Sequence, residues 1–166
     1  MEKILTRIAW FVGLLLVQVL FLNKIFLFGL ATPFIYVYFI LVLDRDIDKN
    51  TLLLVAFTLG MLVDVFSNTP GVNAGATVLL AFIRMRLLRL FSPREEFDNY
   101  EPGIEVMGIW PFVRYAFIAV LVHHSVLFLL ESFSFANIGY LLLRVVCSAL
   151  LTVMLVMSLE FVRHRR

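Results

Sequence analysis

The sequence predicts an all-helical membrane protein with six transmembrane helices, and three observations carry this prediction. Apolar residues make up 62% of the chain and charged residues 16%, whereas a typical soluble domain has about 45–50% and about 25%. Six apolar runs, each near the length that crosses a bilayer of about 30 Å, follow one another. None of them alternates as a transmembrane barrel strand would. We therefore expect a single transmembrane domain, residues 1–166.

The first two apolar runs are separated only by the short break Asn23-Lys24. The first covers residues 4–22 and follows basic residues, as a signal peptide would. It has no small-residue cleavage site, so we expect it to be retained as a span. The second covers residues 25–43 and has Pro33 in its middle, where neighbouring helices can satisfy the freed carbonyl group.

A turn separates the third and fourth runs. The third, residues 51–66, is short for a span, since about 20 residues are normally needed. The turn at residues 67–71 is marked by Pro70 and Gly71. The fourth run covers residues 72–91, and its last turns carry arginines. These two runs therefore predict a helical hairpin.

The last two runs follow the one long polar segment of the chain, residues 92–109. The fifth run covers residues 110–130. A loop without basic residues, 131–137, leads to the sixth run, residues 138–162, and a basic tail follows it.

Basic residues fall on alternate connections and set the expected orientation. Only Lys24 and Arg144 would lie toward the outer side, and Trp10 and Trp110 would anchor the inner interface. Both termini are therefore expected in the cytoplasm. The basic residues of the expected cytoplasmic side are Lys3, Arg7, Arg45, Lys49, Arg84, Arg86, Arg89, Arg94, Arg114, Arg163, Arg165 and Arg166.

Polar residues inside the predicted spans gather in the outer leaflet. A charged side chain within a span usually faces the bundle interior and pairs. Asp64 and Arg144 could therefore pair across an outward-facing cavity. In the alternative, Arg144 reaches the outer headgroups and Asp64 caps the turn, and the two hypotheses are compatible. The polar cluster comprises Gln18, Asp64, Asn73, His123, His124 and Arg144.

The acidic run Asp44-x-Asp46-x-Asp48 copies the start of a calcium-binding EF-hand loop. The copy then fails, because Lys49 stands where the tight-turn glycine belongs and Val55 where the bidentate glutamate belongs. A solvated charged loop is expected, and no metal site.

Two short patterns have structural interpretations. His123 and His124 point about 100° apart on a helix and have no ligand-type neighbours at suitable spacing, so we expect buried neutral or partner-facing histidines. The pair Gly71-x-x-x-Gly75 permits close helix approach, either within the hairpin or between two copies.

The basic cluster near the end of the fourth run favours attraction to anionic inner-leaflet lipid, and a protein partner is the alternative. This cluster comprises Arg84, Arg86, Arg89 and Arg94. No phosphate-binding glycine loop, nucleophile–base set or haem-ligand pair occurs in the sequence. We therefore expect no enzyme, no cofactor, no metal and no nucleic-acid partner.

The hairpin resembles the rod shape-determining protein MreD family. That family has a Gly-x-x-x-Asp segment, then a turn, then a Gly-Val-x-Ala helix start. Here these read Gly60-Met-Leu-Val-Asp64 and Gly71-Val-Asn73-Ala74. The resemblance implies a structural or partner-binding hairpin whose residues are Gly60, Asp64, Pro70, Gly71, Asn73 and Gly75.

The resemblance extends to the layout of the chain. Thr32-Pro33 stands where the family has a proline near the start of its second span, but Phe34-Ile35 replaces the acid and aromatic that many members show there. The length, the six spans and the cytoplasmic termini agree. The implied fold is that of the six-helix substrate-binding subunits of energy-coupling-factor transporters.

The resemblance also implies a function. MreD-like proteins belong to the inner-membrane machinery that organises lateral peptidoglycan synthesis in rod-shaped bacteria. We therefore expect a non-catalytic scaffold of the bacterial inner membrane that maintains cell shape. Its expected partners are the lipid bilayer, an MreC-like bitopic protein, a RodA-type glycosyltransferase, a penicillin-binding transpeptidase and MreB. The alternative is a transport subunit that binds a small molecule in the outward cavity.

Overall fold

The structure is a computed structural model that describes residues 2–92, 100–132 and 137–164. These residues form helices and connecting segments and no strand, so the all-helical prediction is confirmed for them. The elements are α1 (Glu2–Leu20), the 3-10 helix η1 (Leu22–Lys24), α2 (Val37–Val42), α3 (Lys49–Ser67), α4 (Val72–Phe91), α5 (Ile104–Met107), α6 (Ile109–Ser132) and α7 (Ile138–His164).

Four helices of the described residues, α1, α3, α6 and α7, are long and apolar enough to cross a membrane. The length and composition of these four helices are consistent with a protein that crosses the membrane several times. Helix α4 has a similar length but carries Arg84, Arg86 and Arg89, which separates it from these four by composition.

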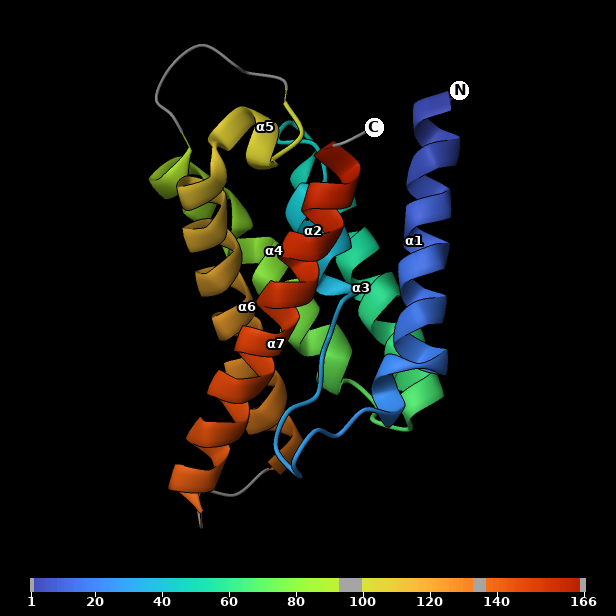
Figure 1. Cartoon of the computed structure of the whole chain (residues 1–166). Coiled ribbons are helices and arrows are strands. Elements are labelled where there is room, and N and C mark those ends of the chain that lie inside the picture. The colour runs from blue at the N-terminus through green and yellow to red at the C-terminus, as the bar shows by residue number, and fades with distance from the viewer. Residues whose placement is uncertain (1, 93–99, 133–136, 165–166) are drawn as a thin grey trace.

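The long helices lie along one axis, and the N-terminus of α1 and the C-terminal end of α7 lie at the same end (Figure 1). We call this the terminal end. The opposite end carries the turn of residues 68–71 between α3 and α4, and we call it the hairpin end (Figure 1).

Helix α4 lies at the centre of the bundle. It packs against α3 on one side and α6 on another, and α7 packs against α6. Small residues of α4, Ala74, Ala76 and Ala81, are buried and let these neighbours approach closely. Helix α1 is peripheral, since only Leu14, Leu15 and Gln18 of its side chains are buried.

The expected helix over residues 25–43 is wrong for most of its length. Only the six residues of α2 are α-helical there. Residues 25–36 include a tight turn, in which Phe28 and Gly29 have φ angles of 54° and 70°. Proline disfavours helical dihedrals in the residue before it, so Pro33 keeps the chain extended as it enters the bundle.

Side chains of α7 replace the missing helical hydrogen bonds of this segment. The backbone N–H of Thr32 donates to Ser148 Oγ at 3.0 Å, and that of Phe34 donates to Thr152 Oγ1 at 3.0 Å. Ser148 and Thr152 are four residues apart, so they lie on one face of α7. The irregular backbone of this segment is therefore satisfied by protein groups rather than left without partners.

Candidate functional site

The carboxylate of Asp64 closes the hairpin between α3 and α4. Asp64 lies in the last turn of α3, is 2% exposed and accepts four hydrogen bonds. The backbone N–H groups of Asn73 and Ala74 donate to it at 2.9 Å each, so it caps the start of α4. Asn73 Nδ2 and Thr69 Oγ1 supply the other two donors, also at 2.9 Å.

The turn itself uses left-handed backbone. Asn68 ends α3 with a φ of 54°, and Gly71 precedes α4 with a φ of 83°. Glycine adopts this conformation at least cost, which explains Gly71. Pro70 lies exposed between them. The turn predicted at residues 67–71 is therefore present.

Gly60 and Gly75 allow the close approach of different neighbouring helices. A Cβ atom on Gly60 would lie 2.6 Å from the Cα of Ala74, so Gly60 allows the backbones of α3 and α4 to touch. A Cβ atom on Gly75 would instead lie 3.2 Å from Leu130 Cδ1 of α6. The expected close approach within the hairpin therefore depends on Gly60, while Gly75 makes room for α6.

Arg144 does not pair with Asp64. Its guanidinium lies 3.1 Å from the Glu131 carboxylate and 4.3 Å from the centroid of the Phe128 ring. Of the two hypotheses for Asp64, the structure forms the turn cap. Arg144 neither pairs across the bundle nor depends on headgroups alone, because α6 supplies both its carboxylate and its aromatic partner.

A buried polar chain continues from Asn73 into the core. The hydroxyl of Tyr36 donates to Asn73 Oδ1 at 3.0 Å and lies 3.0 Å from His123 Nε2. Thr77 Oγ1 lies 3.4 Å from the same hydroxyl. Asn73 therefore joins the Asp64 cap to Tyr36 and His123, although these residues come from four separate segments.

The two histidines lie together in the core, with their Nδ1 atoms 3.4 Å apart. His124 Nδ1 lies 2.9 Å from the Val120 carbonyl oxygen, which can only accept, so this nitrogen carries the proton. His124 Nε2 then accepts from the Thr152 hydroxyl at 3.1 Å. The expectation of buried histidines is met, and a chain of contacts runs from α3 to α7.

Gln18, expected in the same cluster, lies in a separate group of hydrogen bonds. Its side-chain Nε2 donates to Asn23 Oδ1 at 2.8 Å and to the Pro33 carbonyl oxygen at 3.0 Å. Asn23 Nδ2 donates in turn to Ser67 Oγ at 2.8 Å. Gln18 therefore ties α1 to the irregular segment and to the end of α3.

A cavity of about 540 Å³ opens at the hairpin end. Charged groups in its lining are Lys24, Glu131 and Arg144, and Asn73 reaches it from the buried chain. Aromatic and aliphatic side chains complete it. Asp64 is not among the residues that line this cavity, and its carboxylate instead accepts hydrogen bonds from Thr69 and Asn73. Arg144 therefore lines a cavity, as expected, whereas Asp64 does not.

The prediction of a lipid-facing basic cluster is wrong for Arg84, which is buried inside the protein. Its side chain is wholly buried and donates to the carbonyl oxygens of Leu43 and, at 3.3 Å, Asp44. These two carbonyl groups directly follow α2, and a cation is favourable near the C-terminal end of a helix. Arg86 and Arg89 are exposed as expected.

Parts of two predicted connections lie outside the described residues. These parts are residues 93–99, which include Arg94, and residues 133–136. The remainder of the long polar segment contains α5. Its first backbone N–H, that of Ile104, donates to the Glu160 carboxylate at 3.0 Å, and the Tyr38 hydroxyl donates to it at 2.5 Å.

Two acidic residues of the loop before α3 form contacts within the protein. Asp48 caps α3 by accepting from the N–H groups of Asn50 and Thr51 at 3.0 and 3.1 Å. Asp44 pairs with Arg7 of α1. Within the described residues, no group of three metal-binding side chains forms.

Sequence reasoning missed Tyr36, Thr152 and Glu160. Tyr36 and Thr152 stand in apolar runs and look like core residues, because their polar partners are distant in sequence. Glu160 had a usable signal, since it is an acid inside an apolar run just as Asp64 is.

Comparisons with known family models, curated proteins and solved structures find no match for the chain. The functional interpretation therefore rests on the hairpin residues and on the geometry of the described part of the chain.

Proposed function

We propose that this protein is a non-catalytic membrane scaffold of the bacterial cell-wall elongation complex, similar to MreD proteins. The observation that carries the proposal is the set of hydrogen bonds and the close helix contact within the hairpin motif. Asp64 caps the backbone of Asn73 and Ala74, while Gly60 lets the two helices touch there. The residues that carry the resemblance therefore act together on one structural feature.

The chemistry of this hairpin favours a structural role over a catalytic one. Both carboxylate oxygens of Asp64 accept backbone hydrogen bonds and are buried. A general base must reach a substrate proton within hydrogen-bond distance. Asp64 instead fixes the angle between α3 and α4, which presents a defined surface to a partner.

The proposal includes six passes through the bacterial inner membrane with both termini in the cytoplasm. Its support is the common placement of the two chain ends (Figure 1) and the concentration of basic residues at the terminal end. Under this topology the hairpin end faces the outside, where peptidoglycan is assembled.

The hairpin end offers an exposed apolar surface for an MreC-like bitopic protein. Val65 and Phe66, directly before the turn, are 68% and 63% exposed. A transmembrane or juxtamembrane segment of that partner would pack there, and a RodA-type glycosyltransferase, a penicillin-binding transpeptidase and MreB would join through the complex.

The test is recovery of tagged protein from its native membrane in detergent, with mass spectrometry of the co-purified proteins. We expect an MreC-like protein and a transpeptidase. Phe66→Ala should reduce their recovery severalfold, whereas Phe161→Ala, an equally conservative change of an exposed phenylalanine on α7, should not. Equal recovery of the partner proteins with both variants would show that the hairpin surface does not bind them.

The cavity at the hairpin end favours one second candidate, a small-molecule-binding subunit of a transporter. Its volume of about 540 Å³ lies in the usual range of ligand pockets, and Arg144 and Glu131 offer both signs of charge. The same recovery experiment separates the candidates, because a transporter subunit would bring a cytoplasmic ATPase pair and a second membrane subunit.

A further inference from the structure

Residues 25–31, which follow η1, form an exposed turn at the hairpin end (blue in Figure 1). All of them are apolar, and they read Ile-Phe-Leu-Phe-Gly-Leu-Ala. Phe28 is 97% exposed, more than any other large apolar side chain of the described residues, and Leu27 beside it is 43% exposed. The turn therefore presents apolar side chains to the surroundings of this end of the protein.

Hydrogen bonds fix the backbone of this turn. The N–H of Leu27 donates to the Ala31 carbonyl oxygen at 2.9 Å, and the Leu27 carbonyl oxygen accepts from the N–H groups of Leu30 and Ala31 at 2.9 and 3.0 Å. The Tyr140 hydroxyl of α7 donates to the Gly29 carbonyl oxygen at 2.9 Å. The turn is therefore a defined structure that is attached to the first turn of α7.

Phe28 has a backbone conformation that is unusual for a bulky residue. Its φ is 54°, and that of Gly29 is 70°. Positive φ at both central residues is typical of a type I′ turn, which prefers Asn-Gly, and a phenylalanine there is an outlier. Such strain persists only where something compensates for it, and it is concentrated at functional positions. Because Phe28 is almost wholly exposed, packing within the described chain does not supply this compensation.

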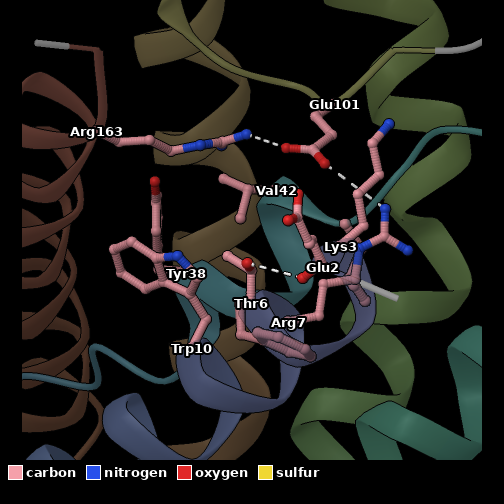
Figure 2. A pocket seen from close by; sticks show the side chains of 11 residues that line it. Glu2, Lys3, Thr6, Arg7, Trp10, Tyr38, Val42, Glu101 and Arg163 are labelled. Carbon is pink, nitrogen blue, oxygen red and sulfur yellow. Dashed lines mark hydrogen bonds and ion pairs between the residues drawn. The ribbon is translucent and has the colours of Figure 1, made fainter. Parts of the chain in front are cut away.

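Helix α7 gives the depth of the turn in the proposed membrane. Arg163 lies at the terminal end of the bundle, where it pairs with Glu101 (Figure 2). The helical path from Arg163 to Tyr140 is about 34 Å long, whereas the hydrocarbon of a bilayer is about 30 Å thick. Tyr140 and the turn attached to it therefore lie just beyond the hydrocarbon, at the level of the outer headgroups.

Two requirements of the turn are met at this depth. Leu27 and Phe28 gain free energy when lipid removes them from water. The N–H groups of Phe28 and Gly29 have no hydrogen-bond partner among the described residues, so they need water and cannot lie inside the hydrocarbon. Leu143, one helical turn from Tyr140, is also exposed, so the apolar surface continues along α7.

We propose that this turn is an interfacial anchor, in which Leu27 and Phe28 insert between the headgroups and acyl chains of the outer leaflet. Phenylalanine and leucine are the side chains with which interfacial segments enter this boundary. Phe26 instead lies against the protein, with the Arg144 guanidinium carbon 5.8 Å from its ring centroid. The anchor rests on the membrane topology proposed above, but it uses no residue of the hairpin motif and does not depend on an MreC-like partner.

Tryptophan fluorescence of the full chain in phosphatidylcholine vesicles tests the depth of the turn. Trp10→Phe and Trp110→Phe remove both native tryptophans, and Phe28→Trp supplies a single reporter. Lipid brominated near the headgroup should quench this reporter more than lipid brominated near the chain ends, and aqueous acrylamide should quench it weakly. The control reporter is Leu150→Trp, at an exposed position of α7 about 20 Å from Arg163. The deep bromines should quench it best.

The two reporters separate failure of the anchor from failure of the topology. If lipid quenches Leu150→Trp while only acrylamide quenches Phe28→Trp, the turn lies in water and the anchor is wrong, although the topology stands. If the deep bromines quench Phe28→Trp best, the turn lies inside the hydrocarbon and the anchor is also wrong. If lipid quenches neither reporter, the anchor and the topology fail together.

A second variant tests whether the protein itself holds the Phe28 ring. Asparagine adopts positive φ more readily than phenylalanine, so Phe28→Asn should leave the melting temperature in detergent unchanged or raise it. Phe112→Asn, which replaces a fully buried phenylalanine, should lower the melting temperature. A clear decrease for Phe28→Asn would show that the ring packs within the chain or against a second copy, which would contradict the anchor.

Discussion

The buried charged side chains Asp64, Arg84 and Glu160 each form hydrogen bonds with backbone groups at or next to a helix end. Asp64 accepts from the first N–H groups of α4, and Glu160 accepts from the first N–H of α5. Arg84 donates to the carbonyl groups of Leu43 and Asp44, which directly follow α2. Helix ends leave such groups without partners. The costly charges therefore stabilise helix ends that lie inside the protein.

The first prediction concerns Asp64. Asp64→Ala leaves the N–H groups of Asn73 and Ala74 without acceptors, so the free energy of unfolding should fall by about 2–4 kcal/mol. Thermal unfolding in detergent measures this. Asp46→Ala, which removes an exposed acid, is the control and should not change the melting temperature.

The second prediction compares two glycines. Gly60→Ala places a methyl group against the α4 backbone and should destabilise the protein by more than about 2 kcal/mol. Gly13→Ala meets open space within α1 and should be neutral or stabilise it by up to about 1 kcal/mol. Equal melting temperatures for the two variants would contradict the contact between α3 and α4.

At the residue scale, sequence reasoning succeeds where a single physical rule limits what a residue can do. A lone acid in an apolar run needs donors, and this identifies Asp64 as a residue that either caps the turn or pairs with Arg144. It does not identify which donors, so the pair with Arg144 stayed open. An arginine near the end of a span resembles one that reaches for headgroups, whereas the acceptors of Arg84, just after α2, are distant in sequence.

At the scale of elements, apolar length predicts where helices lie but not whether an apolar run is helical. The predicted run 72–91 coincides with α4, and 51–66 lies inside α3. Residues 25–43 are equally apolar, yet only α2 is helical. The extended part is stable because α7 supplies hydroxyl acceptors, and hydropathy contains no information about a partner so far along the chain.

The third prediction tests this support. Thr152→Val keeps the shape of the side chain but removes the acceptor of the Phe34 N–H and the donor to His124. We expect a loss of about 2–3 kcal/mol in the free energy of unfolding. Thr58→Val, at an exposed position of α3, provides the control for the same substitution. An unchanged melting temperature for Thr152→Val would show that α7 does not hold the segment.

At the scale of the whole molecule, polar contacts occur in two layers, one toward each end. The hairpin-end layer contains the Asp64 cap and the buried histidines. The terminal-end layer contains the ion pairs of Arg7 and Arg163 with Glu101. Apolar packing separates them. This division fits a molecule whose two ends meet different aqueous phases.

The fourth prediction tests that division. In a Cys147→Ala background, which removes the single cysteine of the sequence, new cysteines would replace Pro70 and Asp46. A membrane-impermeant maleimide added outside intact spheroplasts should label Pro70→Cys and not Asp46→Cys. Labelling of both only after lysis, or of Asp46→Cys alone, would refute the proposed orientation.

The dependence of residues 32–34 on α7 has a consequence for biogenesis. A nascent chain that ends before Ser148 has no acceptors for these N–H groups, and a bare peptide group in hydrocarbon costs several kcal/mol. Under the proposed membrane topology, we therefore expect residues 32–34 to reach their final place only after α7 has been synthesised.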